Sequence, residues 1–227
     1  MTEAERYLAK ASESLASARA DNRARRYNSA ANRAYYAAFQ AAVAALIDAG
    51  IRPADHDWGH RFVISQFSGK LIRRRKLMPR ELRSTLGELF DRRVPADYST
   101  ESVSAGDARG AVKRAGRLVG AVSAKTGTGS AREAEPAYGS EEVKTDRVVK
   151  ARARGLIEEV KQIILQKYPN REFDVVEFGP KDYRLIVRGG RGDLEGIHRV
   201  LDGRTTDILV DHDIWIVILA ESKRRAA

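Results

Sequence analysis

The fold of this chain is decided by residues 28–50, NSAANRAYYAAFQAAVAALIDAG, an alanine-rich stretch that ends at a glycine. Its small alanines alternate with larger apolar side chains, among them Tyr35, Tyr36 and Phe39. Alanines let neighbouring helices approach closely, and aromatic rings fill the space between them. We therefore predict a central bundle helix over residues 26–49, buried on more than one side, that ends at Gly50.

Helical periodicity continues on both sides of this stretch. The first half of the chain predicts five helices joined by short polar loops, over residues 3–20, 26–49, 58–76, 79–93 and 104–124. Proline disfavours helical geometry in the residue before it, so we expect the fourth helix to stop before Pro95. No strand pattern interrupts these segments, which indicates an antiparallel five-helix bundle.

The second half of the chain has a different pattern of apolar and polar residues. Its pattern predicts a helix over 148–168, strands over 173–178 and 183–188, a helix from 193 that continues through 208, and a strand over 214–220. A hairpin over residues 208–217 is an alternative to the end of that second helix. The expected fold is thus mainly α, a helical bundle followed by a small α+β domain of order α-β-β-α-β.

A segment rich in glycine, serine and alanine separates the two halves. It predicts a linker over residues 125–144, between a bundle at 1–124 and an α+β domain at 145–227. The charge changes at the same place, because residues 1–125 hold 23 Lys and Arg against 13 Asp and Glu, which is the whole net charge of +10. A basic domain beside a neutral one indicates that the bundle meets a polyanion, although a charge that serves only solubility is the alternative.

Composition excludes several classes of function. The chain has no cysteine, so it forms no disulfide and has no thiol nucleophile, and its four histidines make a histidine-built metal site unexpected. Neither a cofactor motif nor a membrane-spanning run is present in the sequence. The N-terminal residues MTEAERYLAK lack an apolar signal core, and we expect a cytoplasmic protein without cofactors.

Three segments together resemble a known family. They are SAANRAYYAAFQAAVAALI at 29–47, GH at 59–60 followed by FVISQF at 62–67, and LGELFDRRVPADY at 86–98. This combination resembles the prokaryotic HEPN domains, in particular a subgroup with an R-x-x-A-D-Y signature, over residues 3–124. The resemblance implies an up-and-down helical bundle that usually forms a homodimer. Members of this family include metal-independent ribonucleases of toxin–antitoxin, CRISPR and other defence systems, along with non-catalytic relatives, so the resemblance implies one of these two kinds of protein.

The resemblance also assigns candidate catalytic residues. Nucleases of this family share an R-x4-6-H motif, in which Arg holds the scissile phosphate and His moves protons. Here Arg93 supplies the cation, whereas the histidine positions hold Asp97, Tyr98 and Ser99. We expect His60, at the start of the third helix, to approach this site across the bundle, with a purely structural role in the loop as the alternative. Asp97 could accept a proton, whereas Tyr98 is a weak base at neutral pH.

Further polar residues have competing interpretations. Two basic patches are candidates for nucleic-acid binding: Arg73, Arg74, Arg75 and Lys76 in one, and Arg25 and Arg26 in the other. A cationic run at a helix end also complements the helix dipole, so the first patch has a structural alternative. Arg191 and His198 have the spacing of the nuclease motif, but they lie in the other domain and we regard the match as chance. Three acids, Asp207, Asp211 and Asp213, are expected to be solvated.

Two functions are consistent with these patterns. The first is an RNA- or nucleotide-phosphate-binding protein of the toxin–antitoxin or defence type, with the activity of a metal-independent endoribonuclease as one possibility. The second is a dimeric adaptor without enzymatic activity, whose α+β domain docks a protein partner through its sheet edge. The first hypothesis rests on Arg93 and on the basic charge of the bundle.

Overall fold

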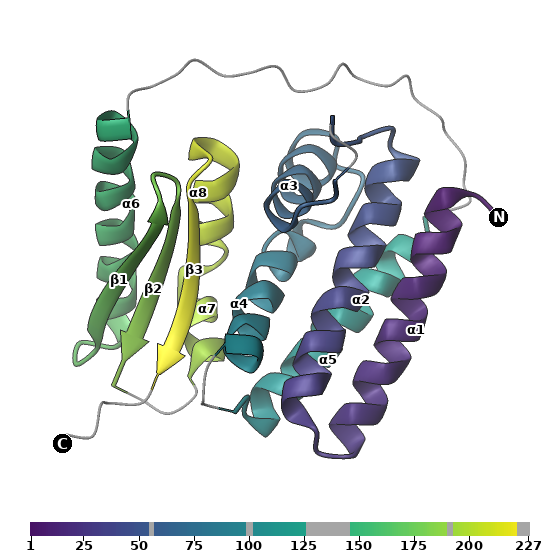
Figure 1. Ribbon diagram of the computed structural model, residues 1–227, viewed down its shortest axis with the longest axis horizontal. Helices are drawn as coiled ribbons and strands as arrows, with labels where there is room; N and C mark the ends of the chain where they lie inside the picture. Colours follow the sequence, from purple (N-terminus) through teal and green to yellow (C-terminus); the bar gives the residue numbers. More distant parts are fainter. Residues whose placement is uncertain (55–56, 99–101, 126–145, 190–192, 222–227) are drawn as a thin grey trace.

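The computed structural model describes residues 1–54, 57–98, 102–125, 146–189 and 193–221, and for residues 95–98 it describes the backbone alone. The described chain is mainly helical, with one three-stranded sheet in its second half. Figure 1 shows the helical bundle beside this sheet, with α4 (Thr85–Tyr98) lying between them. Within these residues, none of the helices has the length and apolarity needed to cross a bilayer.

Three long helices form the body of the bundle: α1 (Glu3–Arg23), α2 (Tyr27–Asp48) and α5 (Ala105–Ser123). Helix α1 begins at Thr2, whose side chain accepts from the Glu5 amide while the Glu5 carboxylate accepts from the Thr2 amide. Helix α2 buries nearly all its alanines together with Tyr35, and it packs against both α1 and α5. The prediction of a central helix buried on more than one side is confirmed.

The predicted third helix is a composite. Helix α3 (His60–Gln66) continues into the π-helix η1 (Phe67–Arg74), and the 3-10 turn η2 (Arg80–Leu82) follows. In this π-helix Gly69 lies against helix α8 (Arg204–His212) of the second half. A Cβ atom at residue 69 would lie 3.1 Å from Cγ1 of Val210, so this contact requires a glycine or a displaced neighbour.

Helix α4 (Thr85–Tyr98) differs from its prediction at both ends. It begins after η2, not at Pro79, and the prediction that it stops before Pro95 is wrong. Proline removes one hydrogen bond, the one its amide would donate to the carbonyl of residue 91, and leaves the others in place. Residues 91, 92 and 94 are buried just before the proline, so packing supports the helix where the backbone bond is lost.

The second half forms an α+β layer. Helix α6 (Asp146–Lys167) precedes β1 (Glu172–Gly179) and β2 (Asp182–Arg188), which pair antiparallel from Glu172–Arg188 to Gly179–Asp182. Helices α7 (Leu194–Leu201) and α8 (Arg204–His212) then lead to β3 (Trp215–Glu221), which lies parallel to β2. The sheet order is β1-β2-β3.

Two helices stand where one was predicted. Asp202 and Gly203 have φ angles of 43° and 77°, and this left-handed pair separates α7 from α8. Glycine adopts this conformation at little steric cost, so the break follows from Gly203. The alternative hairpin over residues 208–217 is wrong, because residues 204–212 are helical.

The α+β layer packs against the bundle of its own chain. One apolar core lies among α6, α7 and the sheet, and a larger one fills the bundle. Leu209 of α8 belongs to the core of the bundle, and Trp215 of β3 packs against it. Figure 1 shows α8 and β3 on the side of the second half that faces α3 and α4. This docking was not predicted from the sequence.

Candidate functional site

Helices α3 and α4 bring His60 and Arg93 to the same tyrosine. The ring of Tyr35, fully buried in α2, has its hydroxyl oxygen 2.7 Å from Nδ1 of His60. The Arg93 guanidinium carbon lies 5.6 Å from the centre of the Tyr35 ring and 5.0 Å from that of the Tyr36 ring. These are cation–π distances. We call Tyr35, Tyr36, His60 and Arg93 the tyrosine cluster.

Aromatic side chains surround the imidazole. The rings of Phe39 and Phe90 lie with their centres 5.1 and 5.4 Å from that of His60. On its other side, Phe90 packs against Trp215 of β3 at 4.7 Å between ring centres. Trp215 of the α+β half therefore packs against Phe90, one of the rings that contact His60.

Burial and charge keep His60 neutral. Burial lowers the pKa of His60 from its ordinary value, and the positive charge of Arg93 lowers it further. Burial raises the pKa of Tyr35 well above its ordinary value, so its hydroxyl stays protonated. In the described part of the chain Nε2 of His60 has no hydrogen-bond partner, which leaves this nitrogen available for proton exchange.

Two predicted catalytic residues follow Arg93 in the same helix. Asp97 comes four residues after Arg93, about one helical turn along α4, and Tyr98 is the last residue of that helix. Their side chains lie outside the described part of the structure, as does the whole of Ser99. The structure therefore brings His60 together with Arg93 and gives Asp97 and Tyr98 a position in the backbone.

The predicted nucleic-acid-binding residues divide into two groups. Three hold protein partners: Arg73 pairs with Asp211 at 2.6 Å, Arg75 donates to the carbonyl of Ala49 at 2.8 Å, and Arg26 pairs with Asp21 at 2.5 Å. The others, Arg25, Arg74 and Lys76, are exposed. The basic patches are thus partly structural.

Sequence reasoning missed a buried charge network around Arg92. This side chain is 1% exposed, and its Nη2 donates to Glu195 of α7 at 2.6 Å. Its Nη1 donates to the carbonyl of Glu88 at 3.0 Å, and Arg114 of α5 also binds Glu195. A buried arginine in α4 thereby joins the bundle to the α+β half. The signal was available in the sequence, where Arg92 comes three residues after the apolar Leu89 and therefore shares its face of the helix.

The adjacent Asp91 makes a second buried contact between the halves. Its Oδ2 lies 2.9 Å from Nε2 of His198 in α7, and both side chains are almost wholly buried. Burial raises the pKa of Asp91 and holds the pKa of His198 well below its ordinary value, because each charged form loses its hydration. His198 therefore belongs to the docking contact, whereas Arg191 lies outside the described residues and the interpretation of its spacing as chance stays a prediction.

The three acids that we expected to be solvated form ion pairs with the bundle. Asp211 binds Arg73, Asp207 lies 3.5 Å from Arg83, and Asp213 pairs with Arg61 at 2.6 Å. Each of these arginines belongs to the bundle, so the acids near the end of the chain complement its positive charge. Among the described residues, no group of three His, Asp or Glu side chains is placed to hold a metal ion.

Comparison with known proteins assigns the first half of the chain. A family model, the HEPN domain, matches residues 4–125, which include every member of the tyrosine cluster. No family model matches the α+β half. A search of the curated proteins finds no match.

Proposed function

Because this chain belongs to the HEPN-domain family, we propose that it binds RNA, with Arg93 of the tyrosine cluster as the contact to a backbone phosphate. Arginine keeps its charge at all physiological pH values and matches the geometry of a phosphate with a planar fork of donors. The exposed Arg25 and Arg74 extend the basic surface of the bundle and contribute contacts to phosphates along the strand.

One observation carries this proposal. Arg93 and His60 come from different helices, and both contact Tyr35. The Arg93 guanidinium carbon lies 5.6 Å from the centre of the tyrosine ring, and Nδ1 of His60 lies 2.7 Å from the hydroxyl oxygen. The fold thus places a permanent cation beside a neutral imidazole at a half-buried position. A cation beside a neutral base is the pairing that RNA cleavage through the 2′-hydroxyl needs.

We further propose that His60 gives this site a metal-independent ribonuclease activity. Neutral His60 accepts the proton of the 2′-hydroxyl as its oxygen attacks the adjacent phosphorus, and Arg93 stabilises the negative charge that develops on the phosphoryl oxygens. In the tautomer that this step requires, Nδ1–H of His60 donates to the hydroxyl oxygen of Tyr35, so the bond orients the imidazole and leaves Nε2 as the basic nitrogen. Asp97, one turn after Arg93, is the residue to which we assign the acid role: its protonated carboxyl donates a proton to the 5′-oxygen as the bond between that oxygen and phosphorus breaks.

A ribonuclease assay tests this proposal. Single-stranded RNA is incubated with the full chain in EDTA at low salt, and both binding and cleavage are followed for the wild type and for Arg93→Gln, His60→Gln and Asp97→Asn. We expect Arg93→Gln to weaken binding and His60→Gln to abolish cleavage while RNA remains bound. Unchanged binding and cleavage in the Arg93→Gln variant would rule the proposal out.

The setting of this activity is also a proposal. We infer a toxin–antitoxin or antiviral defence role in the cytoplasm and a homodimer that carries the tyrosine cluster twice, because the family resemblance implies both. Sedimentation of the purified chain tests the dimer, and growth arrest on expression, relieved by Arg93→Gln, tests the toxin role.

A second candidate function is an adaptor that recruits a protein partner. It is favoured by β1, which in the described chain pairs only with β2 and exposes Val175, Val176 and Phe178. An edge strand with exposed apolar side chains is a template for strand addition. A partner that binds the wild type and Arg93→Gln but not Val176→Lys would favour this function, and a partner lost with Arg93→Gln would oppose it.

A further inference from the structure

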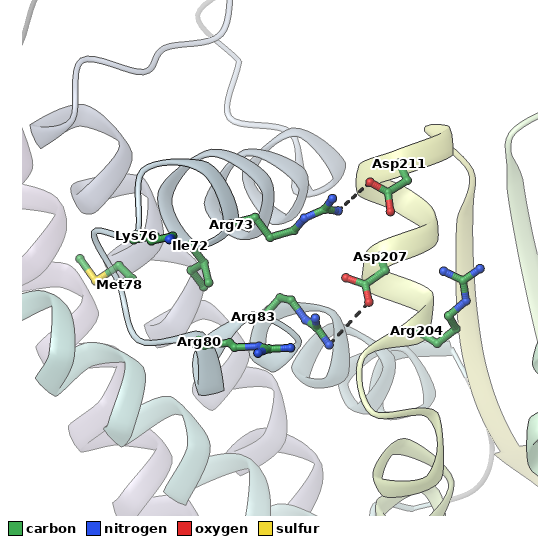
Figure 2. Close-up of a pocket in the computed structure, with 9 residues that line it drawn as sticks. All are labelled: Ile72, Arg73, Lys76, Met78, Arg80, Arg83, Arg204, Asp207 and Asp211. Carbon is green, nitrogen blue, oxygen red and sulfur yellow. Dashed lines mark hydrogen bonds and ion pairs between the residues drawn. The ribbon is translucent and has the colours of Figure 1, made fainter.

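A cavity of about 570 Å³ lies between the bundle and helix α8. Figure 2 shows its lining side chains. They come from η1, from the turn between η1 and η2, from η2 and the residue that follows it, and from α8. The lining consists of Ile72, Arg73, Lys76, Met78, Arg80, Arg83, Arg204, Asp207 and Asp211. None of these residues belongs to the tyrosine cluster, so this cavity is separate from the site described above.

The charge of the cavity is predominantly positive, with five cationic side chains against two carboxylates. Three of the cations have acidic partners, because Arg73 pairs with Asp211, Arg83 with Asp207, and Arg204 with Glu159 of α6. The remaining two, Lys76 and Arg80, have no ion-pair or hydrogen-bond partner through their side chains among the described residues. Figure 2 shows the side chain of Arg80 beside that of Arg83. The cavity thus holds two uncompensated positive charges.

Backbone hydrogen bonds fix the two positions from which these cations extend. Lys76 has a φ of 52° and stands in a turn closed by bonds from the Arg75 amide to the Lys70 carbonyl and from the Leu77 amide to the Leu71 carbonyl. Arg80 opens the 3-10 turn η2, in which the Arg83 amide donates to its carbonyl. A left-handed lysine is strained, and such strain is retained where the surrounding structure enforces it. The backbone positions from which both charges extend are therefore fixed before any ligand arrives.

We propose that this cavity binds a small molecule that carries two or more linked phosphate groups, such as a nucleoside triphosphate. Lys76 and Arg80 bind the phosphate oxygens, with Arg83 beside them as a third donor. Ile72 and Met78 provide an apolar surface next to these charges, and the volume is in the range typical of small-molecule sites. The ligand also neutralises the surplus positive charge of the cavity.

Such a ligand would strengthen the docking of the two halves. Its phosphates contact the turn after η1 and the turn η2 of the bundle, while Arg204 lines the same cavity from α8 of the α+β half. A molecule that binds only the docked arrangement stabilises that arrangement by mass action. Phosphate-rich metabolites that bind this cavity therefore stabilise the docked arrangement of the two halves, independently of RNA binding at Arg93.

Calorimetric titration of the full chain at low salt tests the proposal with sodium tripolyphosphate, ATP, inorganic phosphate and adenosine. We expect tripolyphosphate and ATP to bind, phosphate to bind more weakly, and adenosine not to bind. The double variant Lys76→Gln/Arg80→Gln should weaken the binding of tripolyphosphate roughly tenfold or more. Its matched control is Lys113→Gln/Arg117→Gln, which removes the same charge from exposed positions of α5 and should leave the affinity unchanged.

Two further variants sharpen the test. Asp211→Asn releases Arg73 and removes a negative charge, so it should tighten the binding of tripolyphosphate. Arg93→Gln should leave this binding intact, which separates the cavity from the proposed RNA site. The proposal is overturned if the wild type binds no tripolyphosphate, if both double variants lose affinity equally, or if adenosine alone binds as well as ATP. Both double variants alter exposed side chains, and circular dichroism confirms that they remain folded.

Discussion

Arg93 of α4 and His60 of α3 meet at the ring of Tyr35, where the guanidinium lies over the ring face and the imidazole bonds to its hydroxyl at 2.7 Å. A buried tyrosine thereby fixes the relative position of a cation and a neutral base. The arrangement depends on α4 being held in place, and the buried contacts of Asp91 and Arg92 with α7 do this from the opposite half of the chain.

RNA cleavage should depend on pH through His60. The base is active when it is neutral, and burial together with Arg93 lowers its pKa below the ordinary value of 6.5. We therefore expect the acidic limb of the pH–rate profile, in which protonation of His60 stops cleavage, to have its midpoint below 6.5. A pH–rate profile measures this, with His60→Gln as the inactive control. A midpoint above 6.5 would contradict the assignment.

Arg92 should contribute much more to stability than another arginine that approaches the same carboxylate. Arg92→Met removes a buried cation from the partly buried carboxylates of Asp107 and Glu195 and should cost about 3 kcal/mol of unfolding free energy. Arg199 also approaches Glu195, but its side chain is 71% exposed, and Arg199→Met should cost less than about 1 kcal/mol. Urea denaturation compares the two. Equal losses would show that the network does not hold the halves together.

The contact of Asp91 with His198 should behave as a coupled pair. His198→Leu and Asp91→Val each leave a buried polar group without its partner, and each should cost about 2–4 kcal/mol. The double variant Asp91→Val/His198→Leu removes both polar groups, so its loss should be smaller than the sum of the two single losses. Thermal and urea unfolding of the four proteins form the cycle, and strict additivity would argue against a direct interaction.

Two glycines should respond in opposite ways to the same substitution. Gly69→Leu places a side chain against Val210 of α8 and should cost about 1–3 kcal/mol by overpacking. Gly120 lies in α5 with nothing near its Cβ position, so Gly120→Leu should raise stability by about 0.5–1 kcal/mol. Melting temperatures distinguish the two. A stabilised Gly69→Leu variant would mean that α8 does not pack there.

Local patterns in the sequence were sufficient for the helical bundle. The alanines around Tyr35 predicted a buried central helix, and the loop residues placed the ends of α1, α2 and α5 within a few residues. Pro95 misled the prediction of α4, because buried neighbours maintain a helix that the local rule would end. The break at Gly203 was missed for a related reason, since the apolar spacing continues across the left-handed pair.

The site was only partly predictable. Arg93 and His60 were named from the family resemblance, and the structure brings them together through Tyr35, which periodicity had assigned to packing alone. The docking of the two halves could not be predicted, because each of its contacts joins residues that are far apart in the chain. The sequence around Glu195 and His198 does not indicate that their partners are Arg92 and Asp91. It indicates only that polar side chains lie on an otherwise apolar helix face.

The proposed contact between Arg93 and phosphate is tested most directly by the affinity for single-stranded RNA of Arg93→Gln, compared with Arg117→Gln at the same salt concentration. Arg117 is exposed on α5 and carries the same charge, so it controls for the loss of one positive charge. We predict a loss of roughly tenfold or more in affinity for Arg93→Gln and little change for Arg117→Gln. Equal affinities in the two variants would contradict a role for Arg93 in holding the phosphate.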